Sequence, residues 1–568
     1  MEDIWTYKPA DREQIEKIAR ILNCHRITAT LLVNRGINTP EKAYAFLFPS
    51  LEHLSDPFSI KDMDKAASRI ITAIENREKI LIFGDFDADG VTATSLLNDF
   101  LSLTDADITW YIPHRTKEGH GLGKDHIAMA AEQDIDLIIT VDCGSDSYEA
   151  VLAAAGEDID VIVTDHHETP KDLPLAAAVV NPKRKDCPSQ LTYLAGVGVA
   201  FYLVIALRQM LRKKGFWKET KEPNLLQYCD LVAVGTIADM VPLKNENRIL
   251  TRAGINIIKE GLRPGLRALT DLGRIDCRYI DAEDIAFKIA PKINAAGRIS
   301  HARICVSLLT SKEKTGAEQT ADILDRHNRK RQQIEIGILD DIEKKISSMP
   351  DILKKAVVIL WDKKWHPGVL GIAASKISKK YARPAVLIST AVHPASGSCR
   401  STGTINIHDA LCQCSGFLEK FGGHFMAAGL SIKEKNLVSF SSALENRLND
   451  DTCEPDFKNK IFLDCPLDLK DITDTLFNEI EKLKPFGMDN PEPVFKSSRV
   501  NVVSSYIIGA KHRKMILEQG ERKIEAIEFN IDDPDITPKF FKTIAFKIKI
   551  NRFKNQAVHQ IIIEQKNF

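Results

Sequence analysis

The sequence predicts an α/β protein with two α/β domains, a long helix that joins them, and a small C-terminal β-barrel. Three observations carry this prediction. Strand-like apolar runs alternate with helical stretches from about residue 79 to 185, and the alternation returns between residues 355 and 450. A charged, proline-free stretch of helical pattern separates these regions. After about residue 455 the chain changes to short strands in which apolar and polar residues alternate.

The composition is that of a globular protein with several cores. A chain of 568 residues is expected to divide into about three or four domains. No apolar run approaches the roughly 18 residues that a membrane span needs, and the first residues lack the pattern of a signal peptide. The eleven cysteines are scattered without the spacing of a zinc site. We therefore expect a cytoplasmic protein with free thiols, and a formal net charge of −1 leaves both acidic and basic binding faces open.

The N-terminal region, residues 10–75, has a helical pattern. Asp11 is placed to cap a first helix, whose apolar positions Ile15, Ile18 and Ile21 fall at helical spacing. A further helix is expected over residues 61–76, directly before the first strand. We expect this region to pack against the first sheet.

Three apolar runs in the first α/β region end in polar groups. Residues 79–83, 137–141 and 160–163 have the continuous apolar pattern of strands that are buried on both faces. Ligands bind beyond the carboxyl ends of the strands in an open parallel sheet, so the groups that follow these runs should converge in one pocket. Those groups are Gly84-Asp85-Phe86-Asp87-Ala88-Asp89-Gly90, Asp142-Cys143-Gly144 and Thr164-Asp165-His166-His167. Residues 230–239 form another buried segment, strand or helix, that ends in Asp239.

Together these segments supply more acids and imidazoles than one cation needs. Like charges held this close would raise one another's pKa values unless metal ions neutralise them. Carboxylates with some imidazole suit two Mn²⁺ or Mg²⁺ ions, which at roughly 3.5–4 Å apart can support phosphoester hydrolysis. A lone Asp-x-Asp or His-His pair is usually a solvated or structural feature, whereas three acid-bearing strand ends favour a metal centre. The predicted residues are Asp85, Asp87, Asp89, Asp142, Asp165, His166, His167 and Asp239.

Polar side chains in loop-like segments are candidates for binding substrate. A glycine-rich loop spans residues 111–123, a second loop is expected over residues 290–298, and the second α/β region has its own glycine-rich polar segments. Guanidinium groups bind phosphate bidentately, which favours the arginines. Each side chain could instead cap a helix or brace a loop. The candidates are Arg115, Asn294, Arg298, Ser398, Arg400 and His424.

Residues 314–345 are expected to form one helix, about 45 Å long at 1.5 Å per residue, that connects the two α/β regions. In the barrel region, Phe546, Ile548 and Ile550 alternate with Lys547 and Lys549. Residues 536–568 hold seven Lys or Arg against one Glu. A cationic barrel face is therefore expected, and it is either a nucleic-acid platform or a solvated surface.

These patterns give four domain segments. Residues 1–312 hold the N-terminal helices and the first α/β domain, residues 313–350 the connecting helix, residues 351–454 the second α/β domain, and residues 455–568 the barrel. Two α/β halves that are joined by a helix should leave a cleft, with metals on one wall and Arg400 and His424 on the other. A cleft too narrow for a duplex would select single strands by shape.

At its motifs the chain resembles the DHH phosphoesterase superfamily and, within it, the RecJ family of bacterial single-strand-specific exonucleases. The resemblance covers nearly the whole chain, and it includes the DHH-associated domain and the lead into an oligonucleotide-binding (OB) fold. The motifs are the two acid-bearing strand ends and the Asp165-His166-His167 triplet given above, together with Leu194-Ala195-Gly196-Val197-Gly198, Gly235-Thr236-Ile237-Ala238-Asp239, Asn294-Ala295-Ala296-Gly297-Arg298, Trp365-His366-Pro367-Gly368-Val369, Gly422-Gly423-His424, Leu483-Lys484-Pro485-Phe486-Gly487 and Asn490-Pro491-Glu492-Pro493.

The resemblance implies 5′-to-3′ removal of mononucleotides from single-stranded DNA, in recombination and repair. It implies Asp165 as a support, His167 as the residue facing the scissile phosphate, and Arg115, Ser398 and Arg400 as ligands of a phosphate near the 5′ end. It also implies a helicase and a single-strand-binding protein as partners. The implied metal ligands are Asp85, Asp87, Asp89, Asp142, His166 and Asp239.

Two other functions compete with this one. A DHH phosphodiesterase for short oligonucleotides or cyclic dinucleotides usually needs only the two α/β halves, so the barrel favours long DNA. A non-catalytic single-stranded-DNA-binding scaffold of replication would have lost acids that are all present here. Three departures from the family pattern, Phe86, His120 and Phe425, are expected to touch no metal ligand.

Overall fold

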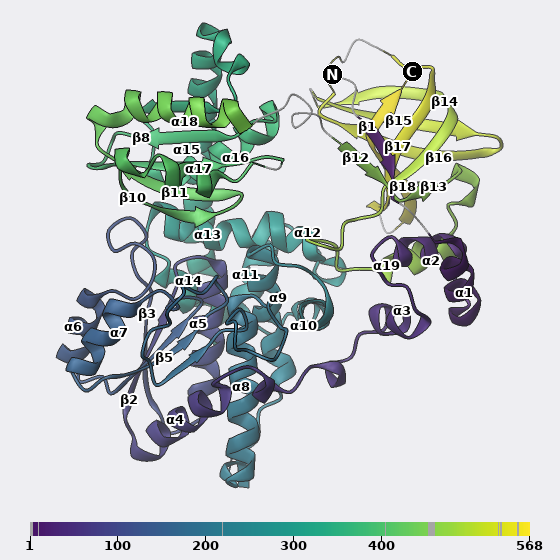
Figure 1. The fold of residues 1–568 in the computed structure, drawn as a ribbon. Helices are drawn as coiled ribbons and strands as arrows, with labels where there is room; N and C mark the ends of the chain where they lie inside the picture. Colours follow the sequence, from purple (N-terminus) through teal and green to yellow (C-terminus); the bar gives the residue numbers. More distant parts are fainter. Residues whose placement is uncertain are drawn as a thin grey trace.

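A computed structural model describes nearly the whole chain (Figure 1). The described residues are 4–8, 11–218, 220–403, 405–451, 460–509, 511–531, 533, 537–553 and 556–567. The predicted boundary at residue 455 lies outside them. Among these residues, no helix has the length and apolar character needed to span a membrane.

The first α/β domain is built on a parallel sheet whose strands lie in the order β3-β2-β4-β5-β6. Alternate side chains of the strands enter two cores. Ile80 and Ile82 face α4, α5 and α8, whereas Leu81 and Phe83 face α6 and α7. Burial on both faces explains the continuous apolar runs. The elements are β2 (Lys79–Gly84), β3 (Asp107–Tyr111), β4 (Leu137–Val141), β5 (Asp160–Thr164), β6 (Ala178–Val180), α4 (Met63–Asn76), α5 (Ala88–Leu101), α6 (Lys124–Glu132), α7 (Tyr148–Gly156) and α8 (Gly196–Lys213).

A layer of helices completes this domain. The segment that ends in Asp239 is a helix, which settles the alternative that its pattern left open. The expected loop over residues 290–298 is wrong, because α13 covers it. Pro291 lies in the first turn of this helix, where a proline is tolerated, and Ile293 and Ala296 are buried on its inner face. The helices are α9 (Cys229–Ala238), α10 (Asn245–Glu260), α11 (Pro264–Leu272), α12 (Ala282–Asp284), α13 (Ala290–Ile299) and α14 (Arg303–Thr310).

The connecting helix α15 spans Lys314–Ser348, which confirms the predicted connector. It leads to a second sheet of order β10-β11-β9-β8-β7, in which only β7 and β8 pair in parallel. The end of α15 and α16 cover one face of this sheet, and α17 and α18 cover the other. The elements are β7 (Val358–Asp362), α16 (Leu370–Tyr381), β8 (Ala385–Ser389), β9 (Ala395–Arg400), α17 (Ile407–Gln413), β10 (Leu418–His424), β11 (Ala427–Ile432) and α18 (Leu437–Asp451).

The C-terminal domain is a closed barrel of β14, β15, β16, β18 and β17, because β17 pairs back to β14. This order of strands and the closure are those of an OB fold, so the predicted fold class is confirmed. The elements are β12 (Lys460–Leu463), β13 (Cys465–Pro466), α19 (Asp474–Glu481), β14 (Phe495–Ile508), β15 (His512–Gln519), β16 (Arg522–Phe529), β17 (Phe540–Phe553) and β18 (Gln556–Asn567).

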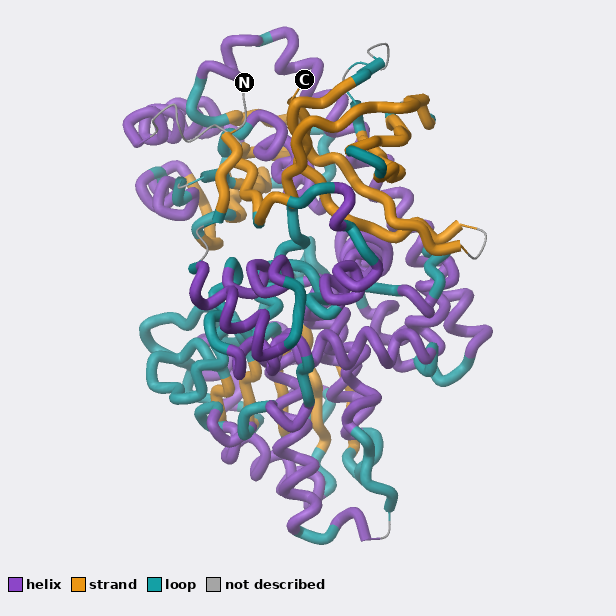
Figure 2. The backbone as a smooth tube through the Cα atoms, turned by 90° about the vertical axis from the view of Figure 1, so that its right-hand side faces the viewer, coloured by secondary structure: helices purple, strands orange, loops and turns teal. Residues whose placement is uncertain are grey.

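The N-terminal helices belong to the barrel's core and not to the first sheet. Strand β1 (Ile4–Tyr7) pairs in parallel with β12. Buried side chains of α1 (Arg12–Leu22), α2 (Arg26–Val33) and α3 (Pro40–Leu47) share one apolar cluster with the barrel and α19. In Figure 2 the barrel faces the viewer, and these helices lie below its strands. Helix α4 and the segment before it pack on the core of the first sheet, so the expected packing of residues 10–75 is wrong for the first three helices.

Part of the expected cationic face of the barrel is neutralised by ion pairs. Lys549 Nζ lies 2.7 Å from Glu283 Oε2 of the first domain and 2.9 Å from Glu492 Oε1. Lys547 Nζ lies 3.0 Å from Glu564 Oε1. Lys549 therefore faces the first domain, while Lys539 and Lys542 are exposed. The binding of nucleic acid by the remaining cationic face stays a prediction.

Candidate active site

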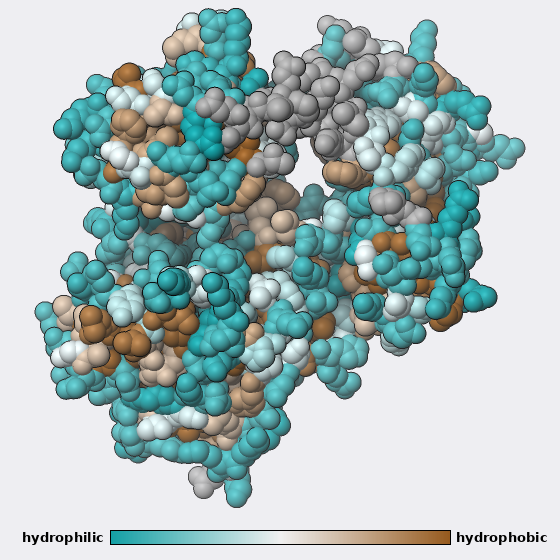
Figure 3. Space-filling model, viewed as in Figure 1, coloured by the Kyte–Doolittle hydropathy of each residue, from teal (hydrophilic) through white to brown (hydrophobic). Residues whose placement is uncertain are grey.

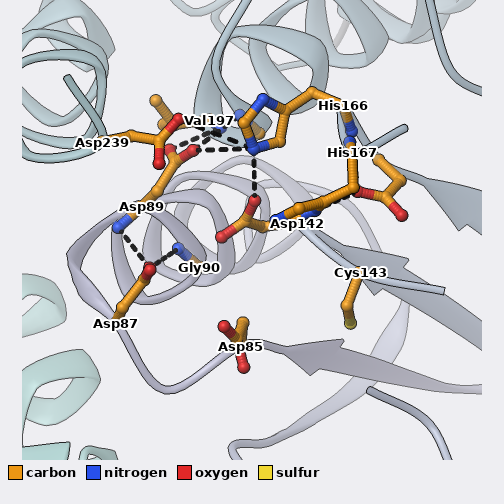
Figure 4. A network of polar contacts seen from close by, with 12 residues as sticks. Asp85, Asp87, Asp89, Gly90, Asp142, Cys143, His166, His167, Val197 and Asp239 are labelled. Atoms are coloured by element: carbon orange, nitrogen blue, oxygen red, sulfur yellow. Dashed lines mark hydrogen bonds and ion pairs between the residues drawn. The ribbon is translucent and has the colours of Figure 1, made fainter. Parts of the chain in front are cut away.

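The carboxyl ends of β2, β4 and β5 lie side by side, and the end of α9 meets them (Figure 4). His166 lies at the centre of this group. Its Nε2 atom is 3.1 Å from Asp142 Oδ1, 3.6 Å from Asp239 Oδ2 and 3.8 Å from Asp89 Oδ2. Four separate segments of the chain thus deliver their acid or imidazole groups to one place, as the strand ends predicted.

Overlapping sets of side chains at this place could each hold a cation. In each of three sets, the ligand atoms lie within 4.8 Å of one another. Asp142 and His166 each belong to two sets, and shared ligands are what two adjacent ions require. The sets are Asp85 with Asp87 and Asp142, Asp142 with His166 and His167, and Asp89 with His166 and Asp239.

Local backbone geometry orients the carboxylates of this site. The Asp87 carboxylate caps α5 by accepting the N–H groups of Asp89 at 2.9 Å and Gly90 at 3.2 Å. Asp142 has a φ of 62°, a left-handed conformation that Asp adopts more readily than most residues with a side chain. Asp239 follows the last residue of α9, so it projects from the end of a buried helix.

The start of α8 explains the Leu194-Ala195-Gly196-Val197-Gly198 motif. The backbone N–H groups of Gly196 and Val197 donate to Asp89 at 2.7 and 2.9 Å, since a helix N-terminus stabilises an anion. A Cβ at Gly196 would lie 2.4 Å from Asp142 Oδ1. Glycine therefore lets the helix approach both acids.

Asp165 supports the site without facing it. Its Oδ2 accepts the Ser145 N–H at 2.9 Å, and its Oδ1 accepts the His166 N–H at 2.7 Å and lies 2.8 Å from His167 Nδ1. These contacts and the histidine charges hold the pKa of Asp165 below its ordinary value despite burial. His167 is thereby fixed with its Nε2 edge free for another partner.

Buried polar atoms without partners show that this donor set fits divalent cations. Asp85 Oδ1 is buried without a hydrogen-bond partner, and Asp142 Oδ1 and His166 Nε2 are buried in contact with each other but form no hydrogen bond. Burial and the neighbouring carboxylates raise the pKa of Asp142 well above its ordinary value and that of Asp239 to about 9. Burial, aided by the charge on His167, lowers the pKa of His166 to about 3. Closely packed acids beside a neutral imidazole suit hard metal ions.

A cleft of about 790 Å³ opens beside these acids, between the two α/β domains. His166, His167 and Asp239 lie on one wall, and His424 and Phe425 of the β10–β11 hairpin lie on the other. Figure 3 shows the molecule hollowed between these two lobes. The predicted cleft is therefore present with His424 on its second wall, whereas Arg400, which was predicted beside it, does not line this cleft.

Sequence reasoning missed several residues of this cleft. Lys183, Tyr193, Lys244, Asn406 and His408 also line it. A signal for Lys183 was available, because Asn181-Pro182-Lys183 directly follows β6, a fourth strand end of the same sheet. The other four lie in irregular segments or at helix starts, where no local pattern marks them.

The three predicted substrate arginines converge at the junction of the two α/β domains. Arg115 lies with its Cζ 4.8 Å from the Phe86 ring centroid. Burial and the charges of Arg115, Arg331 and Arg400 lower the pKa of Arg298 to about 9. In the part of the chain that the structure describes, Arg115, Arg298 and Arg400 form no ion pair. Such a cluster of cations is suited to an anion.

The remaining candidates have local roles that the structure defines. Asn294 Oδ1 accepts the Ala88 N–H at 2.8 Å, so it braces the loop that carries the acids. Arg400 donates to Ser398 Oγ at 3.1 Å and to the Cys399 carbonyl at 2.8 Å. Ser398 therefore orients the guanidinium group.

Family comparisons agree with this architecture. A model of the DHH family N-terminal domain matches residues 79–236, the DHHA1 domain matches residues 353–450, and the RecJ OB domain matches residues 463–565.

Relatives match over nearly the whole chain. The chain is 34% identical to the single-stranded-DNA-specific exonuclease RecJ of Bacillus subtilis, over 99% of this chain and 70% of that protein. It is 33% identical to the same exonuclease of Escherichia coli over 94% of both chains. The crystal structure of RecJ in complex with Mn²⁺ from Thermus thermophilus covers 100% of this chain and 79% of that one, with a TM-score of 0.84 at 27% identity. The chain therefore belongs to the RecJ family of single-stranded-DNA-specific exonucleases.

Proposed function

We propose that this protein is a metal-dependent 5′-to-3′ exonuclease that releases mononucleotides from single-stranded DNA, in recombination and repair. The observation that carries the proposal is the sharing of Asp142 and His166 between neighbouring ligand sets at the wall of a cleft. Relatives that match most of the chain are named single-stranded-DNA-specific exonucleases, which supports the substrate class.

The proposed cofactor is a pair of Mn²⁺ or Mg²⁺ ions. Related RecJ structures from Thermus thermophilus are complexes with Mn²⁺ and with Mg²⁺. When bound, two such cations lower the pKa of water and neutralise charge that develops on a phosphate. The proposed ligands are Asp85, Asp87, Asp89, Asp142, His166 and Asp239.

His167 is proposed to contact the scissile phosphate. It is held by Asp165 through Nδ1 and lies on the cleft wall, so its other ring edge faces the space where a strand would lie. The contact with Asp165 raises the pKa of His167 although burial opposes this. A protonated imidazole at this point donates a hydrogen bond to an anionic phosphate oxygen.

Arg115, Arg298 and Arg400 are proposed to bind the phosphate at the 5′ end, with Ser398 orienting Arg400. The cluster adjoins the acids. Burial lowers the pKa of Arg115, although the charges of Asp87 and Asp85 are close enough to oppose this shift. An anion held there would fix the distance between the strand end and the bond to be cut. This arrangement favours release of one nucleotide at a time. His424 and Asn294 are proposed to complete the substrate site, His424 from the facing wall and Asn294 through the acid-bearing loop.

We also infer a cytoplasmic site of action with a helicase and a single-strand-binding protein as partners. The support is chemical, because an enzyme that needs an exposed single strand depends on activities that open a duplex and that bind the strand. The cleft is proposed to exclude a duplex by its width.

The second candidate is a phosphodiesterase for short oligonucleotides or cyclic dinucleotides. The observation that favours it is that the acids and the arginine cluster lie within the two α/β domains alone. The match to the RecJ OB domain favours the exonuclease. A non-catalytic scaffold is disfavoured, because every predicted acid is present and converges.

Incubation of the purified protein with end-labelled single- and double-stranded DNA, with and without Mn²⁺, tests the proposal. Mononucleotides should appear from the 5′ end of the single strand, and only with the metal. Products released from the 3′ end, equal cleavage of the duplex, or cleavage limited to dinucleotides would contradict it.

A further inference from the structure

His120 is one of the three residues that depart from the family pattern, and it contacts Asp85, a proposed metal ligand. The expectation that this residue touches no proposed ligand is wrong. Its Nδ1 atom lies 3.1 Å from Asp85 Oδ2, within hydrogen-bond distance. The contact links the glycine-rich loop between β3 and α6 to the first acid that follows β2.

The loop places His120 through its flanking residues. Gly119 has a φ of 87° and Gly121 a φ of 82°, both in the left-handed region that glycine adopts without strain. Two such residues turn the chain on each side of His120 and direct its ring inward. The ring centroid lies 5.5 Å from that of His167 and 6.2 Å from that of Phe86, in edge-to-face arrangements.

The two oxygens of Asp85 differ in their surroundings. Asp85 is buried, and its Oδ2 faces His120 while its Oδ1 has no hydrogen-bond partner. The ligand set that includes Asp85 also contains Asp87 and Asp142, and it does not contain His120. One oxygen of Asp85 therefore contacts the imidazole, and the other has no hydrogen-bond partner.

We propose that His120 is a positioning residue, whose Nδ1–H holds Asp85 Oδ2 so that the carboxylate presents its other oxygen to the metal. This inference rests on the proposed ligand role of Asp85. Groups that hydrogen-bond a ligating side chain fix its orientation, and their loss weakens metal binding about 10–100-fold. His120 is 42% exposed, so its replacement leaves the core of the domain intact.

Three variants separate orientation from packing. His120→Phe keeps a ring but removes the N–H donor. His120→Asn keeps an N–H donor near the position of Nδ1. His114→Phe is the matched control, since His114 lies in the same loop and packs edge-on against His301, away from the acids.

Mn²⁺ binding to the full-length protein, measured by the free-ion electron paramagnetic resonance signal, is the primary readout. His120→Phe should weaken binding about 10-fold, His120→Asn should recover most of the loss, and His114→Phe should leave the affinity unchanged. In assays with single-stranded DNA, His120→Phe should recover its rate as Mn²⁺ is raised, with the KM for DNA unchanged.

Asp85→Asn distinguishes this inference from the ligand assignment. If Asp85→Asn weakens Mn²⁺ binding and His120→Phe does not, the positioning role is overturned while the proposed function stands. If Asp85→Asn leaves Mn²⁺ binding intact, the ligand set itself is wrong. An equal loss in His120→Phe and His120→Asn would also overturn the role of the N–H donor.

Discussion

The two walls of the cleft are built on different principles. The first α/β domain ends its parallel strands in acids at one edge, so Asp142 and His166 meet through the regular register of the sheet. The second domain has a mostly antiparallel sheet. Its hairpin presents His424 to the cleft, and Arg400 lies at the end of β9, near Arg298 of the first domain. Parallel strand ends concentrate like charge that only cations can balance, whereas the other wall supplies hydrogen-bond donors and positive charge. The proposed metal ligands thus all come from the first domain, whereas the proposed substrate contacts come from both domains.

The strongest test of this division removes a shared acid. Asp142→Ala should reduce Mn²⁺-dependent nuclease activity more than about 100-fold, since even a residue behind a metal ligand contributes 10–100-fold. Binding of single-stranded DNA, measured by fluorescence anisotropy, should persist because the second wall is untouched. Activity near the wild-type level would refute the shared-ligand assignment.

A second substitution removes the support of His167, a residue of the first wall. Asp165→Asn keeps the side chain's size but removes the negative charge that orients His167, and about a 10–100-fold loss of rate is expected. The single-turnover rate should fall while DNA affinity stays constant. A change confined to affinity would place His167 in binding only.

Arg400→Ala tests whether the second α/β domain binds the 5′ phosphate. Loss of one charge-assisted contact to phosphate, worth about 1.5–3 kcal/mol, should reduce the preference for a 5′-phosphorylated end about 10-fold or more. The measurement compares degradation of 5′-phosphate and 5′-hydroxyl strands, with Lys183→Ala as a control from the other wall. An unchanged preference would remove Arg400 from the end-binding site.

Metal removal should also change the stability of the first domain. The folded-state pKa values of Asp142 and Asp239 are raised, so their contribution to metal-free stability is present near pH 4 and is lost as pH rises toward about 9. The Tm of the protein in EDTA should therefore fall across this window. Mn²⁺ at 100 times its Kd should restore about 2.7 kcal/mol. A Tm in EDTA that is independent of pH would contradict the raised pKa values of Asp142 and Asp239.

The acids were predictable because each directly follows a strand whose apolar run is visible in the sequence. Features that depend on distant partners were not. The association of Ile18 with Phe546 joins residues at opposite ends of the chain, and Lys549 is paired with Glu283 of another domain. The helix over 290–298 is not evident from the sequence because Pro291 and Gly297 resemble loop residues. Pro291 lies in the first turn of the helix, and Gly297 is buried within it. The contact of His120 with Asp85 depends on a turn that only the backbone angles reveal.

The parallel pairing of β1 with β12 has a consequence for synthesis. Helices α1–α3 leave the ribosome first, yet the side chains that cover them, such as Leu476 and Phe546, are translated more than four hundred residues later. Contacts at this separation form slowly and leave apolar surface uncovered in the meantime. A nascent chain cut short before the barrel would leave that apolar surface uncovered, and we expect chaperones and proteases to recognise it.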